Sequence, residues 1–287
     1  MKRVAMETLS LSKINYFLKT KTLGQKIISF TTVDSTNSEA KRRSADEPEG
    51  AVLLSEVQTA GRGRLGRQWL SPGGNIWLTV LLKPELPATK IPSLTSVAAA
   101  AVCLALEQLR PSIADRLQIK WPNDILLNGR KIGGILTEMQ VSAAKVQAVI
   151  LGIGLNVNLK AEDFPEEIRS LASSIYLETG EIPSREQLIA SILNSLEHLY
   201  FKFLEDDLSE TLAVCRRKSA VLGRKIILID HSGKPTSSGK LDRSGSPSGQ
   251  IREAEALDLG SNGELLIRYE NGEKASIISG EISLRLQ

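Results

Sequence analysis

The apolar residues between positions 26 and 153 fall into short runs that are separated by polar or turn residues. Such runs predict buried strands, here over residues 26–30, 51–57, 75–82, 117–120, 125–127, 131–140 and 146–153. Asn128-Gly129, between two of these runs, is typical of a two-residue hairpin turn. The later strands are therefore expected to be adjacent and antiparallel.

Apolar residues at helical spacing predict the elements that cover this sheet. The pattern is clearest over residues 184–204, where an apolar side chain recurs every three or four positions. Asp34-Ser35 offers an N-cap to a polar helix, and Pro92-Ser93 opens a long apolar one. The predicted helices cover about residues 35–44, 93–109, 184–204 and 208–218. Strands that alternate with helices in this way predict an α/β (α+β) fold.

The pattern changes after Gly223, where short strands alternate with Gly, Ser and Asn turns. These strands are predicted over residues 225–230, 253–259, 264–269 and 275–278, and they indicate a small β-barrel. Residues 232–249 are rich in Ser, Gly, Pro and Lys and predict a loop within that barrel. We therefore expect an N-terminal extension over residues 1–24, a main domain over 25–222 and a barrel domain over 223–287.

Composition narrows the functional class. The 287 residues carry a net charge of +3, which is too balanced for a protein that coats nucleic acid. Cys103 and Cys215 lie in apolar helical patterns without Cys or His at metal-ligand spacing, so we expect reduced core thiols. The chain begins without a signal-peptide pattern, and its longest apolar stretch, residues 97–106, is too short to span a bilayer. We expect a cytoplasmic protein without membrane association.

The stretch from Gly61 to Trp69, GRGRLGRQW, combines a flexible backbone with positive charge. Glycine lets the main chain approach a ligand closely, and the planar donor fork of arginine suits phosphates and carboxylates. The stretch is not a Walker loop, because the terminal Gly-Lys-Ser/Thr is missing. Taken alone it is better interpreted as a solvated basic patch, so its context has to decide.

Three further stretches favour a ligand site, each with an ordinary structural alternative. KWPND at 120–124 ends a strand in a sharp turn that would mount Lys120 rigidly, although a surface lysine beside a core tryptophan also fits. Alternate glycines in VILGIGLNVN at 149–158 indicate close approach of a ligand or a bulge. DSTN at 34–37 is a plain helix N-cap or the polar wall of a pocket.

Together and in this order the stretches resemble one family. DSTN at 34–37, Gln58 with GRGRLGRQW, KWPNDILL at 120–127, KIGGIL at 131–136, GIGLNVN at 152–158 and GEISLR at 280–285 are similar to motifs of the biotin protein ligases. The resemblance covers about residues 25 to 285. It implies a catalytic domain related to class II aminoacyl-tRNA synthetases with a mixed sheet, followed by an SH3-like barrel. It also implies that ATP and biotin form biotinyl-5′-AMP and that the biotinyl group then passes to a lysine.

The resemblance also implies roles for particular residues. The biotin site would comprise Ser35, Thr36, Asn37, Gln58, Arg62, Gly63, Arg64 and Lys120. The ATP or adenylate site would comprise Arg62, Arg64, Trp69, Lys120, Asn123, Gly152, Gly154, Asn156 and Arg285. Lys120, Arg62 and Arg64 are the predicted catalytic residues, because attack of a carboxylate on the α-phosphate brings two anions together. Mg²⁺ would enter with ATP, held by phosphates and water, with no dedicated protein metal site.

Other features of the function stay open or rest on the resemblance alone. The expected acceptor is a biotin carboxyl carrier protein of acetyl-CoA carboxylase or a similar enzyme. His198 and His231 lie outside all the motifs, so the general base is unassigned. Only 33 residues precede Asp34, so we expect no DNA-binding domain. A lipoate or octanoyl ligase or transferase of the same fold and a nucleic-acid-binding module remain alternatives, and either a monomer or a homodimer is possible.

Overall fold

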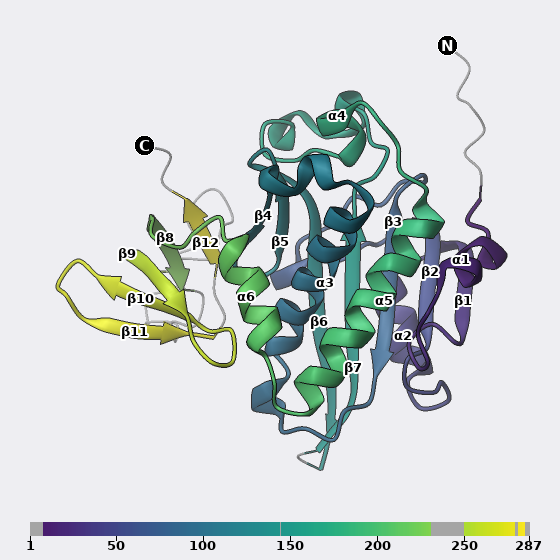
Figure 1. The fold of residues 1–287 in the computed structure, drawn as a ribbon, viewed down its shortest axis with the longest axis horizontal. Helices are drawn as coiled ribbons and strands as arrows, with labels where there is room; N and C mark the ends of the chain where they lie inside the picture. Colours follow the sequence, from purple (N-terminus) through teal and green to yellow (C-terminus); the bar gives the residue numbers. More distant parts are fainter. Residues whose placement is uncertain (1–7, 144, 231–249, 279–280, 285–287) are drawn as a thin grey trace, which may run out of the picture.

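The computed structural model describes residues 8–143, 145–230, 250–278 and 281–284, and its main body is built on one seven-stranded sheet (Figure 1). The strand order is β1-β2-β3-β7-β6-β5-β4; β1 and β2 run parallel, and every other neighbouring pair is antiparallel. The strands are β1 (Ile27–Val33), β2 (Val52–Gln58), β3 (Ile76–Leu82), β4 (Leu117–Lys120), β5 (Asp124–Leu127), β6 (Arg130–Ser142) and β7 (Lys145–Leu155). All seven predicted strands and the mixed α/β fold are confirmed.

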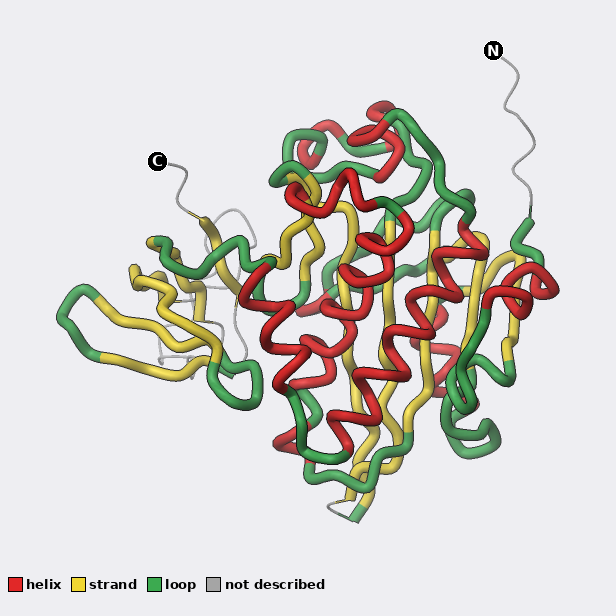
Figure 2. The backbone as a smooth tube through the Cα atoms, viewed as in Figure 1, coloured by secondary structure: helices red, strands yellow, loops and turns green. Residues whose placement is uncertain are grey.

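Helices cover both faces of this sheet. α3 (Ser93–Leu109) and α5 (Arg185–Leu204) lie across one face, with α1 (Leu11–Phe17) packed on α5 and α6 (Ser209–Arg217) on α3 (Figure 2). α2 (Thr36–Arg43) lies against the opposite face over a second, smaller apolar cluster. The short α4 (Ile175–Thr179) was not predicted. Short 3-10 turns are η1 (Arg64–Gly66), η2 (Ala88–Lys90), η3 (Pro111–Arg116), η4 (Ala161–Asp163) and η5 (Glu166–Ile168).

Side-chain alternation explains why one face of the sheet is densely packed and the other has room. Ile76, Leu78 and Val80 of β3 belong to the core under α3 and α5. Trp77 and Thr79 therefore face the α2 side, because successive side chains of a strand point to opposite faces. The same alternation places three small residues of β6 and β7 on the α2 side, namely Gly134, Gly152 and Gly154.

The C-terminal part forms a separate five-stranded antiparallel sheet in the order β11-β10-β9-β8-β12, which fits an SH3-like barrel. Its strands are β8 (Lys225–Asp230), β9 (Gln250–Leu259), β10 (Leu265–Tyr269), β11 (Lys274–Ile277) and β12 (Glu281–Leu284). The four predicted strands are confirmed, whereas β12 was not predicted. The predicted loop at 232–249 lies outside the described residues.

Hydrogen bonds join this sheet to the main body at a turn over residues 260–264. Trp121 Nε1 donates to the carbonyl of Gly263 at 3.0 Å, and Ser93 Oγ donates to the carbonyl of Asn262 at 2.8 Å. Trp121 directly follows β4, so the C-terminal sheet contacts the element that carries Lys120. The proposed domain boundary at residue 223 falls between α6 and β8.

The apolar helical segment Ala88–Leu109 is long and apolar enough to cross a membrane, but 72% of its most apolar 18-residue window is buried inside the protein. It comprises η2 and α3 and packs against the sheet, α5 and α6, as a core helix does. Cys103 of α3 and Cys215 of α6 are free and buried, as predicted. Burial raises the pKa of the Cys215 thiol to about 12, which makes it a poor nucleophile.

The segment that precedes β1 lies along α5. Glu197 of α5 accepts hydrogen bonds from the backbone amides of Lys21, Thr22 and Leu23 at 2.7 to 2.8 Å. Asn194 of the same helix accepts one from the amide of Lys19 at 2.8 Å. The described part of the proposed N-terminal extension is thus packed on the main body, through these backbone hydrogen bonds and through the buried side chains of Ile14 and Leu23.

Candidate functional site

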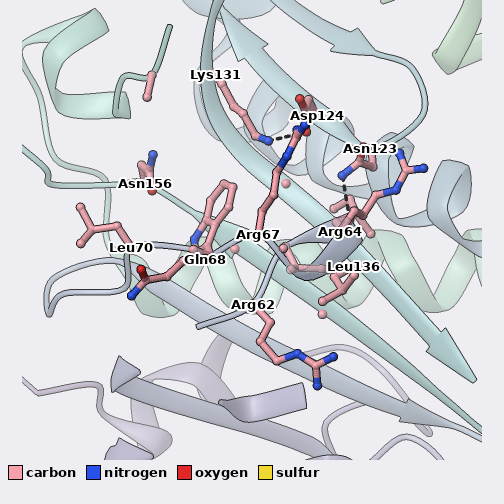
Figure 3. A pocket seen from close by; sticks show the side chains of 18 of the residues that line it. Arg62, Arg64, Arg67, Gln68, Leu70, Asn123, Asp124, Lys131, Leu136 and Asn156 are labelled. Carbon is pink, nitrogen blue, oxygen red and sulfur yellow. Dashed lines mark hydrogen bonds and ion pairs between the residues drawn. The ribbon is translucent and has the colours of Figure 1, made fainter. Parts of the chain in front are cut away.

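A cavity of about 620 Å³ opens on the face of the sheet that α3 and α5 do not cover. Each predicted site residue within the described part of the chain lines it: Ser35, Thr36, Asn37, Gln58, Arg62, Gly63, Arg64, Trp69, Lys120, Asn123, Gly152, Gly154 and Asn156. Arg285, the remaining predicted residue, lies outside the described residues. Segments far apart in the sequence therefore meet around one space (Figure 3).

One end of the cavity is a buried polar network at the start of α2. Gln58 Nε2 donates to Ser71 Oγ at 2.8 Å, so Gln58 Oε1 faces Thr36, whose amide and hydroxyl donate to it at 2.8 and 3.0 Å. Thr79 Oγ1 lies 2.8 Å from Thr36 Oγ1 and 2.7 Å from Asn37 Oδ1. The two threonine hydroxyl protons thus serve three contacts. Thr79 has one hydroxyl proton for two neighbours, so either Thr36 Oγ1 or Asn37 Oδ1 keeps a lone pair that could accept from a ligand.

Ser35 caps α2 at this end, as the sequence predicts. Its side chain accepts from the amide of Ser38, and its own amide donates to Asp34 Oδ1 at 2.7 Å. Arg42, about two turns further along α2, donates to both carboxylate oxygens of Asp34 and lowers the pKa of that carboxyl to about 2. The DSTN stretch is therefore both a helix N-cap and part of the cavity wall.

The Arg/Gly stretch folds into a short hairpin over the cavity. The amide of Gly63 donates to the carbonyl of Arg67 at 2.7 Å, and the amide of Trp69 donates to the carbonyl of Gly61 at 2.9 Å. Gly61 has no alternative here, since a Cβ would lie 2.4 Å from the carbonyl oxygen of Trp69. At the tip, Leu65 takes a left-handed conformation with φ of 56° and is exposed.

The first two arginines of this hairpin extend in different directions (Figure 3). Arg62 Nη2 lies 3.3 Å from Glu138 Oε1 of β6, next to the polar network. Arg64 Nη1 donates to Asn123 Oδ1 at 3.0 Å, in the turn that follows Lys120. The structure therefore brings Arg64, rather than Arg62, to the element that carries the predicted catalytic lysine.

Lys120 stands at the end of β4 on the cavity side, because Leu117 and Ile119 point into the core. Asp124 is its partner across the β4–β5 turn, but the Asp124 carboxylate pairs with Lys131 Nζ at 2.5 Å (Figure 3). Within the described chain the Lys120 ammonium has no hydrogen-bond or ion-pair partner. Lys131 thus neutralises the nearby acid and leaves Lys120 able to meet an anionic ligand.

The glycines of β6 and β7 allow two side chains to lie flat on the sheet. A Cβ at Gly152 would lie 2.2 Å from Asn37 Oδ1, and a Cβ at Gly154 would lie 2.9 Å from Trp69 Nε1. Gly134 likewise faces the Trp69 ring. Trp69 Nε1 is buried without a hydrogen-bond partner among the described residues, so the indole donor is available to a group in the cavity.

Sequence reasoning missed the opposite end of the cavity. Apolar residues of the loop after β7 form its rim: Leu159, Phe164, Ile168, Leu171 and Ala172. Leu171 is 68% exposed and Ile168 is 38% exposed, so this rim offers apolar surface to a planar ligand. The signal in the sequence was weak, because these residues lie in a loop without strand or helix periodicity. Arg67, Asp124 and Lys131 line the cavity and were also not predicted.

The described residues include no group of three or more His, Cys, Asp or Glu side chains that could hold a metal ion. A Mg²⁺ ion that entered with a nucleotide would take most of its ligands from phosphate and water. His198 pairs with Glu210 at 2.9 Å on the far side of α5 and does not line the cavity. His231 lies outside the described residues.

Comparison with known proteins identifies relatives of this chain. Residues 27–156 match the model of the Biotin/lipoate A/B protein ligase family. The bifunctional ligase/repressor BirA of Bacillus spizizenii is 42% identical over 198 residues, which are 68% of this chain and 60% of that protein's length. The biotin--[acetyl-CoA-carboxylase] ligase of Mycobacterium tuberculosis is 33% identical over 200 residues, which are 67% of this chain and 70% of the relative.

A solved structure is similar over nearly the whole chain. The biotin protein ligase from Aquifex aeolicus in complex with biotin and ATP is 30% identical, with a TM-score of 0.71, and the match covers 92% of this chain and all of that one. The similarity therefore includes the main sheet, the cavity and the C-terminal sheet together. On this evidence the chain belongs to the biotin protein ligase family.

Proposed function

We propose that the protein is an ATP-dependent biotin ligase that forms biotinyl-5′-AMP and transfers biotin to a lysine of a carrier protein. The observation that carries the proposal is the single cavity that joins a polar recognition end, an unpaired lysine and an apolar rim. Its volume of about 620 Å³ is in the range of sites for ligands of this size. Membership in the biotin protein ligase family supports the same activity.

The polar network at the start of α2 is the proposed site for the ureido ring of biotin. A ureido group carries two N–H donors and one carbonyl acceptor, so it needs matching groups in an otherwise apolar slot. The network of Thr36, Thr79 and Asn37 has one acceptor more than its own protons can satisfy. Biotin would supply the missing donor.

The central part of the cavity is the proposed site of adenylation. A carboxylate oxygen of biotin attacks the α-phosphorus of ATP, the bond from that phosphorus to the bridging oxygen breaks, and pyrophosphate leaves. Lys120 and Arg64 would cancel the repulsion between the two anions and stabilise charge on the phosphoryl oxygens. The adenine would lie against the apolar rim that includes Phe164 and Leu171.

In the second step the amine of an acceptor lysine attacks the acyl carbon, the bond to the phosphate oxygen breaks, and AMP leaves. We propose as acceptor a biotin carboxyl carrier protein, since relatives such as the Mycobacterium tuberculosis ligase are named for acetyl-CoA carboxylase. A cytoplasmic location, absence of specific DNA binding, and a monomeric or homodimeric state belong to the same proposal.

Pyrophosphate release tests the proposed function directly. The purified protein should release pyrophosphate only when biotin and ATP are both present, and should then label a biotin carboxyl carrier domain. Thermal shift with biotin and with lipoate, measured side by side, separates the two acids that the matched family model covers. Stabilisation by lipoate alone, or pyrophosphate release that does not depend on biotin, would refute the proposal.

A further inference from the structure

Glu138 of β6 contacts the polar recognition network but does not itself line the cavity. Its carboxylate contacts two residues that do line it. Oε2 accepts from Asn37 Nδ2 at 3.0 Å, and Oε1 lies 3.3 Å from Arg62 Nη2. One carboxylate therefore connects the start of α2 to the Arg/Gly hairpin through their side chains.

The first consequence concerns the orientation of the Asn37 amide. Its Nδ2 has acceptors on two sides, the Glu138 carboxylate and the carbonyl of Leu136 at 3.3 Å. Its Oδ1 must then face the Thr79 hydroxyl at 2.7 Å. Because Asn37 is only 5% exposed, a reversed amide would place its oxygen against two other acceptors, the Glu138 carboxylate and the Leu136 carbonyl, in a buried place. Glu138 thus fixes which atom of Asn37 faces the recognition network.

The second consequence concerns Arg62, whose side chain is half exposed on a glycine-rich hairpin. A side chain in that position has many conformations, and holding it in one costs conformational entropy. The ion pair with Glu138 anchors the Arg62 side chain next to Asn37, where the two side chains can contact the same ligand. The Glu138 side chain is 23% exposed, so solvent screens the pair less than it would screen a surface pair.

We propose that Glu138 is a positioning residue that sets the affinity of the cavity for its small-molecule acid, without touching that acid. It acts by orienting the Asn37 amide and by anchoring Arg62. The proposal rests on the proposed function in that the acid is taken to be biotin. It predicts a selective effect, because the side chains that contact the Glu138 carboxylate are Asn37 and Arg62, whereas the groups proposed to meet the phosphates include Lys120 and Arg64.

The test uses Glu138→Gln, which keeps the shape of the side chain and removes its charge. Whichever way the new amide turns, its NH₂ faces a donor of Asn37 or Arg62, so one contact is lost. We expect the Kd for biotin to rise about tenfold, while the KM for ATP and kcat at saturating biotin stay within about twofold of the parent. The matched control is Glu255→Gln, which breaks an Arg–Glu pair between β9 and β10 and should change none of these three constants.

A double-mutant cycle separates positioning from a general loss of stability. If Glu138 acts partly through Arg62, Glu138→Gln combined with Arg62→Gln should weaken biotin binding by less than the product of the two single effects. Multiplicative effects would overturn the proposal, as would biotin binding by Glu138→Gln within twofold of the parent. Should Glu138→Gln fail to fold, Glu138→Asp must show the same selective loss for biotin.

Failure of the proposed function has a different signature. A parent protein that neither binds biotin nor releases pyrophosphate with it would refute the ligase activity, and the role of Glu138 would fall with it. If the parent performs both steps and Glu138→Gln binds biotin as tightly as the parent does, only the role of Glu138 is refuted.

Discussion

Gly152→Ala is the substitution that tests the recognition network most directly. The added Cβ would lie 2.2 Å from Asn37 Oδ1, a separation that van der Waals contact does not allow, so the Asn37 side chain must turn away. Turning it disrupts hydrogen bonds to Thr79, to Glu138 and to the carbonyl of Leu136. The change of one hydrogen atom to a methyl group therefore disconnects a buried amide from all three partners.

The structure gives the size of the effect. A buried hydrogen bond contributes roughly 0.5–1.5 kcal/mol net, and one to a charged group contributes more, so the three contacts amount to about 3 kcal/mol. Alanine recovers about 0.5–1 kcal/mol over glycine in a strand, which leaves a net loss of about 2 kcal/mol. For a domain of this size that loss lowers Tm by about 4–8 °C. Biotin affinity should fall by about tenfold or more, since about 1.4 kcal/mol corresponds to a factor of ten.

Thermal unfolding and biotin titration measure the two effects, with Gly63→Ala as the matched control. Gly63 lines the same cavity, but its φ is −108° and a Cβ there would lie 3.5 Å from its nearest neighbour, so alanine fits without strain. The control should keep the Tm of the parent. If Gly152→Ala kept both the Tm and the biotin affinity of the parent, Asn37 would not be held as we describe and the recognition network would lose its basis.

Three further predictions address the remaining parts of the site. Lys120→Ala should slow formation of biotinyl-AMP by a factor on the order of 10², as loss of a transition-state donor often does. Lys145→Ala, at the exposed start of β7, should leave the rate unchanged. An adenylation rate of Lys120→Ala equal to the parent's would exclude Lys120 from the chemistry. Arg64→Gly removes the anchor to Asn123, so biotinyl-AMP should dissociate faster and label more of an irrelevant protein. The control is Leu65→Gly, which adds similar backbone freedom but removes no anchor. Equal release by the two variants would show that Arg64 does not hold the hairpin closed. Asp34→Asn should destabilise the protein near neutral pH, and the difference from the parent should shrink as pH falls from about 4 towards 2: Arg42 lowers the folded-state pKa of Asp34 to about 2, so its stabilisation is present above the unfolded pKa and is lost on protonation. This effect should be small, because Asp34 is 44% exposed, and a difference in urea unfolding that did not change with pH would contradict it.

The elements of this fold follow from local pattern because local forces define them. The helix predicted at 184–204 is α5 almost residue for residue, since its apolar spacing lasts five turns and Ser184 caps it. The strand predicted at 146–153 is shorter than β7, which continues to Leu155, because glycines interrupt the apolar pattern that marks a strand. α4 was not predicted because five residues are too few to show a helical period, and β12 was not predicted either.

The residues of the candidate site also differ in how well the sequence predicted them. The motifs themselves drew attention to the residues from Ser35 to Asn156 that line the cavity, because Gly, Arg and Asn are costly or unusual where they stand. The apolar rim around Leu171 carried no comparable signal, since an apolar residue in a loop has many explanations. That the motifs belong together came from their resemblance to a family, and that they enclose one space came from the structure.

Only the tertiary structure decided which charge pairs with which. The family resemblance grouped Arg62 and Lys120 as catalytic residues, whereas in the structure Arg62 pairs with Glu138 and Asp124 pairs with Lys131. Lys120 is left without a partner among the described residues. The tertiary structure also decided that Gly152 makes room for Asn37, a residue more than one hundred positions earlier in the chain. The sequence determines such local properties as helix caps, strand alternation and turn type, because they depend on neighbours within a few residues. Ion pairs and close contacts between distant segments depend on strand order and twist, which arise only when the whole sheet is packed.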